Sequence, residues 1–176
     1  MNPALGHEVE PEYQVTPAVV KKKIMIIGAG PAGMECAITA AKRGHEVTVF
    51  DKAARIGGNL YAYAMADLAR PDDLLSVISH YEVVAKRLGI EIRLNTEVHA
   101  KFMRSVLHQY DVCVIAAGAS ADRTHYENIE GVELMVDAFD VAHGRIAAGK
   151  RVVVIGGGKV GLTVAEALRK NQGADV

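Results

Sequence analysis

Short apolar runs alternate with helical patterns along most of the chain. Residues 23–27 form a continuous apolar and β-branched run, which is typical of a strand buried on both faces of a parallel sheet. Similar runs predict further strands at 46–50, 90–94, 111–116, 132–136 and 151–155. Apolar residues at helical spacing predict helices at 31–43, 72–88, 100–107 and 160–170, with a helical turn at 137–142. Since parallel strands need crossovers that are usually helical, this alternation predicts an α/β fold with a doubly wound parallel sheet.

Glycines at fixed spacing separate the first predicted strand from the first predicted helix. Gly28, Gly30 and Gly33 form a Gly-x-Gly-x-x-Gly motif, in which Pro31 and Ala32 fill two of the other positions. The first glycine makes a tight turn, the second lets the backbone approach a pyrophosphate, and the third lets helix and strand pack closely. The anion then lies at the positive end of the helix. The motif predicts a Rossmann-like site for an adenine dinucleotide.

An acidic residue stands where this motif requires one. Asp51 ends the second predicted strand, about 20 positions beyond the glycines. Its carboxylate would accept hydrogen bonds from the ribose hydroxyls of the adenosine, and it would repel a 2′-phosphate. This argues against NADP at the first site, but it does not choose between FAD and NAD.

The strand–turn–helix pattern occurs a second time near the end of the sequence. Gly156, Gly158 and Gly161 follow the predicted strand 151–155, which predicts a second pyrophosphate turn, for NAD(P)H. Its ribose-selecting residue falls at or beyond Val176, so NADH and NADPH are not distinguished. We therefore expect an extended arm at 1–20, where prolines prevent regular structure, a domain that binds the ADP moiety at 21–148, and the incomplete start of an NAD(P)H-binding domain at 149–176.

Composition and charge exclude several other classes of protein. The 176 residues contain 20 Lys and Arg against 21 Asp and Glu, and the only basic run is 21–23, so we expect no nucleic-acid partner. No apolar run approaches the ~20 residues of a membrane span, and residues 1–14 are too polar for a signal peptide, which predicts a cytoplasmic protein with no membrane partner. Cys36 and Cys113 are expected to be buried reduced thiols, and the histidines show no spacing for a metal site.

Several segments together resemble the flavoproteins that bind two dinucleotides. These are the first glycine motif, residues 45–52, and the Gly57-Gly58 pair followed by Asn59 and Leu60. The resemblance is strongest to the C-terminal region of the family of 2,4-dienoyl-CoA reductase, 2-enoate reductase and trimethylamine dehydrogenase, which are old yellow enzyme-like flavoenzymes with an iron–sulfur cluster. Residues 2–8 resemble the stretch that follows the last cluster cysteine in these enzymes. The chain therefore looks like a piece of a larger enzyme.

The resemblance implies FAD at the first site and NAD(P)H at the second. Residues 94–98 resemble the segment whose backbone meets the adenine, and residues 114–118 resemble the stretch that passes close to the FAD. After Gly118 the sequence departs from the family, because Ala119, Ser120 and Ala121 stand where a proline is frequent. Neither a catalytic residue nor a metal ligand is expected in this chain. The expected cofactor-binding residues are Gly28, Gly30, Pro31, Ala32, Gly33, Asp51, Lys52, Gly58, Asn59, Leu60, Val98, Ala117, Gly118, Gly156, Gly158 and Gly161.

The resemblance also implies an NAD(P)H-dependent oxidoreductase. Electrons would pass from NAD(P)H to FAD, then to an iron–sulfur cluster and an FMN, where an activated alkene of the 2-enoate or 2,4-dienoyl-CoA type is reduced. The cluster and the FMN-binding barrel would lie in other parts of the enzyme, and these residues alone are expected to be inactive. No cysteine pair follows Gly58, so a dithiol mechanism is not expected.

Two alternatives stay open. One is a non-redox module that holds ADP, as in trimethylamine dehydrogenase-like proteins, and the other is an electron-transfer subunit like the small subunit of glutamate synthase. The sequence determines neither the alkene nor the oligomeric state, and a homo-oligomer stays open.

Overall fold

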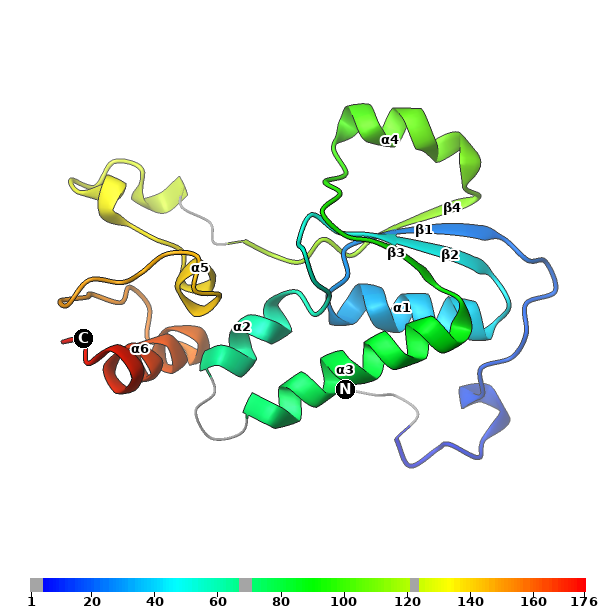
Figure 1. Ribbon diagram of the computed structural model, residues 1–176, viewed down its shortest axis with the longest axis horizontal. Coiled ribbons are helices and arrows are strands. Elements are labelled where there is room, and N and C mark those ends of the chain that lie inside the picture. Colours follow the sequence, from blue (N-terminus) through cyan, green and yellow to red (C-terminus); the bar gives the residue numbers. More distant parts are fainter. Residues whose placement is uncertain (1–4, 67–70, 121–123) are drawn as a thin grey trace. The chain divides into compact units, whose positions relative to one another are not determined.

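A parallel sheet organises the first half of the chain in the computed structural model, which describes residues 5–66, 71–120 and 124–176 (Figure 1). Its strands lie in the order β3-β2-β1-β4. The chain therefore adds β2 and β3 on one side of β1 and then returns to add β4 on the other side. All pairs are parallel, with Ile27 opposite both Phe50 and Ile115. The predicted α/β fold with a Rossmann-like sheet is confirmed. The strands are β1 (Lys23–Ile27), β2 (Glu46–Phe50), β3 (Glu91–Arg93) and β4 (Val112–Ile115).

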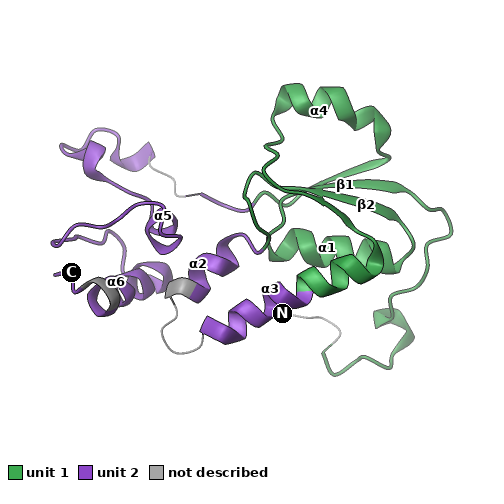
Figure 2. Ribbon diagram, in the orientation of Figure 1, with its two compact units in different colours: residues 1–56, 81–117 green, residues 57–80, 118–176 purple. Residues whose placement is uncertain are grey.

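The chain forms two compact units, coloured separately in Figure 2. Unit 1 contains residues 1–56 and 81–117, and unit 2 contains residues 57–80 and 118–176. The division of the sequence at residues 20 and 148 stays a prediction.

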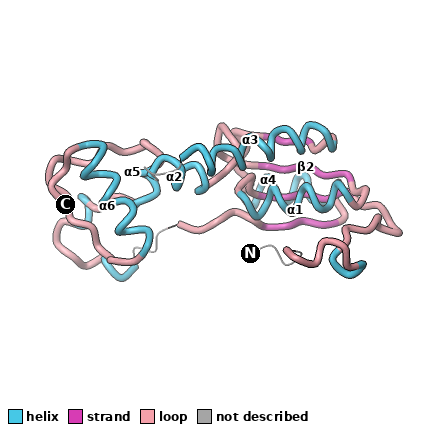
Figure 3. The backbone as a smooth tube through the Cα atoms, turned by 90° about the horizontal axis from the view of Figure 1, so that it is seen from below, coloured by secondary structure: helices cyan, strands magenta, loops and turns pink. Residues whose placement is uncertain are grey.

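Helices cover both faces of the sheet in unit 1. In Figure 1, α1 (Pro31–Lys42) and α4 (Ala100–Val106) lie on opposite sides of the strands, and Figure 3 shows α1 running along them. Met34 of α1 is fully buried, and Phe50 packs edge-to-face against Phe102 of α4 at 5.6 Å between ring centroids. Burying a side chain of this size contributes roughly 1.5–3 kcal/mol. The continuous apolar pattern of β1 and β2 thus follows from burial on both faces.

Helix α3 (Pro71–Leu88) has charges that suit the helix dipole. Asp72 and Asp73 lie in its first turn, and Lys86 and Arg87 lie in its last. Tyr81 is buried, and the loss of solvation, together with the nearby Glu35 carboxylate, raises the pKa of its hydroxyl to about 12. The phenol of Tyr81 is therefore a neutral packing group at physiological pH.

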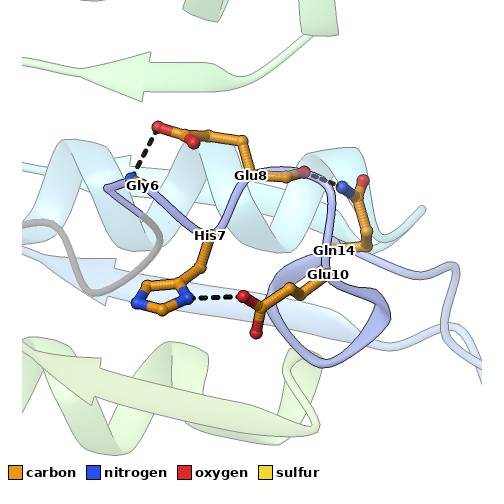
Figure 4. Close-up of polar contacts among 5 residues, drawn as sticks. All are labelled: Gly6, His7, Glu8, Glu10 and Gln14. Carbon is orange, nitrogen blue, oxygen red and sulfur yellow. Dashed lines mark hydrogen bonds and ion pairs between the residues drawn. The ribbon is translucent and has the colours of Figure 1, made fainter.

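Residues 6–14 of the N-terminal arm contact one another, and the Ala18 N–H joins the arm to the Arg43 carbonyl at the end of α1. His7 Nδ1 and Glu10 Oε1 are 2.6 Å apart, and the Gly6 N–H donates to the Glu8 carboxylate, which lowers the pKa of that group. Figure 4 shows these contacts, which join Gly6, His7, Glu8, Glu10 and Gln14. The arm also contains one short 3-10 helix, η1 (Pro11–Tyr13). The expectation that prolines prevent regular structure fails here, because Pro11 occupies the first helical position, where its missing N–H costs nothing.

Among the described residues of unit 2, three α-helices lie wholly within the unit, which also contains residues 71–80 of α3. They are α2 (Asn59–Ala66), α5 (Ala138–Ala142) and α6 (Lys159–Gln172). Val164, Leu168 and Ala174 form a small buried cluster, and Tyr63 packs edge-to-face against Phe139 at 5.8 Å. The predicted helical turn at 137–142 is confirmed as α5, with the Asp137 carboxylate accepting from the Phe139 N–H at its start. The described residues of unit 2 also form the short 3-10 helices η3 (Thr124–Tyr126) and η4 (Val132–Leu134), whereas η2 (Leu107–Gln109) follows α4 in unit 1.

The predicted strand at 132–136 is wrong. Residues Val132–Leu134 form η4 instead, after Gly131 in the left-handed region at φ 86°. The N–H groups of Leu134 and Met135 bond back to the carbonyls of Gly131 and Val132, which closes a helical turn. The Leu134 side chain is 80% exposed. An apolar run of five residues has no strand identity of its own, because a strand requires a partner.

The predicted strand at 151–155 is also wrong in the structure. A single parallel bridge joins Arg151 to Asp175, and the N–H of Val152 donates to the Asp175 carbonyl. Val153 is 89% exposed and Ile155 58% exposed. In the described part of the chain, only this single bridge pairs with the segment. Its apolar residues therefore make no ladder of hydrogen bonds with a neighbouring strand.

No helix within residues 5–66, 71–120 and 124–176 has both the length and the apolar character needed to cross a membrane.

We predict that Gly33→Ala lowers the free energy of unfolding by about 3 kcal/mol, since a Cβ at residue 33 would overlap the Gly28 carbonyl and lie 3.0 Å from its carbon. Chemical denaturation followed by circular dichroism measures the change. Gly149→Ala is the matched control, because its added Cβ would approach nothing closer than 3.9 Å. Equal stability of the two variants would contradict this account of the packing between α1 and β1.

Candidate functional site

A tight turn connects β1 to α1 in unit 1. Gly28 has φ 109°, a conformation that side chains rarely allow, and its N–H donates to the Phe50 carbonyl at 2.7 Å. A Cβ on Gly28 would overlap the backbone of Ala116, which follows β4. The turn is therefore enclosed by the ends of β2 and β4.

The start of α1 presents backbone N–H groups at the end of this turn. Gly30 is the N-cap, with φ −75° and ψ −179°, and its carbonyl accepts from the Met34 N–H at 2.9 Å. Pro31, which has no N–H, and Ala32 are both exposed. The first N–H groups of a helix have no partner within the helix and carry partial positive charge. The arrangement suits an anion such as a pyrophosphate.

The structure brings Asp51 to this turn. Its Oδ2 accepts from the Ala29 N–H at 2.6 Å, and its Oδ1 accepts from the Ala53 N–H at 2.7 Å. The Asp51 backbone is fixed as well, because its N–H donates to the Arg93 carbonyl and its own carbonyl accepts from the Thr96 N–H. The carboxylate is half-buried and has a defined position.

Other expected residues of unit 1 lie in the segments that leave the same edge of the sheet. Lys52 follows Asp51 and is exposed, while Val98 is half-buried beyond the loop after β3. In that loop Asn95 has φ 52°, and its N–H donates to the Ala53 carbonyl at 2.9 Å. The backbone of Ala117 lies near Gly28, with its Cα 3.2 Å from the place where a Cβ of Gly28 would be. Ligands of doubly wound sheets bind outside these carboxyl ends of the strands.

The remaining expected FAD contacts lie in unit 2. The Tyr61 N–H donates to the Gly58 carbonyl and the Leu60 N–H to the Gly57 carbonyl, which opens α2 at Asn59. Gly118 is exposed, with φ 79°. The roles of Gly58, Asn59, Leu60 and Gly118 in binding FAD stay predictions.

The second glycine turn repeats the geometry of the first. Gly156 has φ 105°, and Gly158 has φ −76° and ψ −179°. The Leu162 N–H donates to the Gly158 carbonyl at 3.0 Å, and a Cβ on Gly161 would overlap the Gly156 carbonyl. One difference separates the copies: a Cβ on Gly156 would meet nothing within 4 Å, whereas one on Gly28 would strike the chain after β4.

Sequence reasoning did not identify several groups at the first turn. Ala29 and Ala53 contribute backbone N–H groups, and Ala116 lies against Gly28 with its backbone, none of which the residue type reveals. One signal was available, because aspartate often bonds the backbone N–H two residues ahead, as Asp51 does with Ala53. Asparagine after a strand is likewise a common residue for positive φ, as at Asn95.

The two cysteines are free thiols. Both Cys36 and Cys113 are half-buried, and burial raises the pKa of each. In the parts of the chain that the structure describes, no three His, Cys, Asp or Glu side chains gather as metal ligands would.

Three comparisons relate the chain to known proteins. Residues 22–176 match the family model described as pyridine nucleotide-disulphide oxidoreductase. A cinnamate reductase from Clostridium sporogenes is 39% identical over 176 residues, and an NADH oxidase from Thermoanaerobacter brockii is 34% identical over 184; each match covers 100% of this chain, but 25% and 27% of the relative. A solved 2-naphthoyl-CoA reductase in complex with 2-naphthoyl-CoA is 37% identical with a TM-score of 0.85, over 98% of this chain and 25% of that one.

The chain thus spans about a quarter of the length of these relatives. The predicted resemblance to the nucleotide-binding region of larger flavoenzyme reductases is confirmed. The chain belongs to the pyridine nucleotide-disulphide oxidoreductase family.

Proposed function

We propose that the chain binds FAD through its ADP half at the first glycine turn. The observation that carries the proposal is the placement of the Asp51 carboxylate, which bonds the Ala29 N–H at 2.6 Å beside the open N-terminus of α1. A pyrophosphate at the helix N-terminus and a ribose at the carboxylate are the two features that an adenine dinucleotide needs.

The residues present fit this ligand. Glycine at 28 and 33 lets α1 approach the strand ends, since a Cβ at either position would overlap backbone. A carboxylate offers about four acceptor positions, and the N–H groups of Ala29 and Ala53 use two of them. Two positions are left for the vicinal hydroxyls of a ribose. We assign Lys52, Val98 and Ala117 to the surroundings of the same nucleotide because they leave the same edge of the sheet.

We propose that the second turn, Gly156 to Gly161, takes the pyrophosphate of NAD(P)H. Its support is the backbone geometry it shares with the first turn. The related NADH oxidase favours NADH as the donor. Bound FAD would supply the two-electron redox chemistry, while this chain binds and orients the two nucleotides.

For the whole protein we propose a reductase of activated alkenes. The cinnamate and 2-naphthoyl-CoA reductases among its relatives favour an unsaturated carboxylate or CoA thioester as substrate. In this proposal the iron–sulfur cluster and the FMN are held by parts of the protein beyond these residues.

A non-redox module that holds ADP is the second candidate. It is favoured by the location of the best-defined contacts, because in the proposed binding mode Asp51 and the Gly28 to Gly33 turn would contact only the ADP half of a flavin dinucleotide. The absorption spectrum of the purified protein separates the two candidates, since FAD gives visible flavin bands and ADP absorbs only in the ultraviolet.

The first prediction for this function concerns Gly30. Gly30→Val should weaken binding of ADP and FAD by about tenfold or more, because a branched side chain would stand where the pyrophosphate approaches the turn. Gly30 has φ −75°, which valine adopts without strain, so the fold should survive. Isothermal titration measures the affinity, with Gly149→Val as the control. Unchanged affinity in Gly30→Val would exclude this turn as the site.

The second prediction concerns selectivity at the ribose. The affinity for ADP should be higher than that for 2′-phospho-ADP by about tenfold or more, because the negatively charged Asp51 carboxylate would face the negatively charged 2′-phosphate. Asp51→Asn should narrow this difference. Competition titrations with both nucleotides measure it. Equal affinities in the parent chain would rule out Asp51 as the ribose ligand.

The third prediction is that the 176 residues alone do not turn over NAD(P)H. Gly156 to Gly158 are exposed, and residues 152–155 form no ladder with another strand. The second turn therefore has few surrounding contacts that could hold a nicotinamide against a flavin. An NAD(P)H oxidation assay with added FAD and an artificial acceptor should give the rate of free flavin. Steady turnover above that blank would contradict the prediction.

A further inference from the structure

The Asp51 carboxylate connects two segments of the chain. One oxygen accepts from Ala29, in the middle of the glycine turn, and the other from Ala53, just beyond β2. Ala29 is fully buried, so solvent does not reach its N–H in place of the carboxylate. A buried N–H that loses its partner is costly, and a hydrogen bond to a charged group is stronger than one between neutral groups.

The turn at Gly156 to Gly161 indicates that the Asp51 carboxylate is not needed to give a glycine turn its shape. Gly156 and Gly158 have nearly the same backbone angles as Gly28 and Gly30, although residues 156–158 are exposed. The spacing of the glycines is therefore enough to give the turn its shape. The Gly28 N–H already joins the turn to the end of β2 through the Phe50 carbonyl at 2.7 Å. The bond between Asp51 and Ala29 adds a second link, which runs from the middle of the turn to the side chain that would hold the ribose.

We propose that Asp51 is a positioning residue for the pyrophosphate turn as well as a ribose ligand. By holding the Ala29 N–H, its carboxylate keeps the turn at a fixed distance from the place where the ribose binds. Ribose and pyrophosphate are then recognised together. An anion that lacks a ribose at the matching distance should bind more weakly. The tether depends only on contacts of the ligand-free chain, whereas its effect on binding rests on the proposed function.

Amide hydrogen exchange in the ligand-free chain tests the tether. In Asp51→Ala the Ala29 N–H should exchange about tenfold faster or more. Asp111→Ala is the matched control, since Asp111 makes a bond of the same kind, at 2.7 Å, to the Lys23 N–H at the other end of β1. There the Ala29 rate should not change. Slow exchange at Met25 and Ile26, both fully buried in β1, shows that unit 1 stays folded.

Unchanged exchange at Ala29 in Asp51→Ala, with Met25 and Ile26 still slow, would overturn the proposal. If Asp51→Ala does not fold, Asp51→Asn tests the tether instead. The asparagine side chain has the size of aspartate but only one acceptor oxygen. It should lose protection at Ala29 or at Ala53. Full protection at both residues would overturn the tether.

A double-mutant cycle on ADP affinity tests the consequence for binding. If Asp51 acts through the turn, Asp51→Ala should weaken ADP binding by a smaller factor in a Gly30→Ala background, with a coupling of about threefold or more. Additive effects would confine Asp51 to the ribose and overturn its positioning role. If the parent chain does not bind ADP, the proposed function fails, while the exchange experiment still decides the tether.

Discussion

The close approach of α1 to the end of β1 is the constraint on which the candidate site depends. It is possible only because residues 28 and 33 have no Cβ, since one at Gly33 would overlap the Gly28 carbonyl and one at Gly28 would overlap Ala116. This approach brings the N-terminus of α1 to the carboxyl ends of the strands. The first N–H groups of the helix must then find partners outside it. A steric requirement of packing thus places N–H groups where an anion could bind.

The register of the parallel sheet supplies the second half of the site. Ile27, the last residue of β1, lies opposite Phe50, the last residue of β2, so Asp51 leaves its strand level with the glycine turn. In the same way Phe50 lies opposite Arg93, and the loop after β3 bonds back to the segment after β2 through Asn95 and Thr96. Segments that are distant in sequence meet at one edge because parallel strands end there together.

The sequence predicted those features whose causes are local or strongly patterned. Strands 23–27 and 46–50 were correct at both ends, because full burial on two faces requires a continuous apolar run. The runs at 132–136 and 151–155 have similar composition but lack a neighbouring strand among the described residues. The composition of a run does not indicate whether another strand lies beside it. The proximity of Asp51 to the turn followed from spacing, whereas its bonds to Ala29 and Ala53 involve backbone groups that no residue type identifies.

The two glycine turns show which part of function is encoded locally. Their dihedral angles agree although Gly28 is buried against the chain after β4 and Gly156 is exposed, so the shape of such a turn is determined by about six residues. The reaction is not encoded there. The family model is described by disulphide chemistry, yet Cys36 and Cys113 lie on α1 and β4, and burial raises the pKa of both thiols, which disfavours the reactive thiolate. Membership of the family therefore identifies the kind of cofactor, while the nucleotide turns carry no information about the substrate.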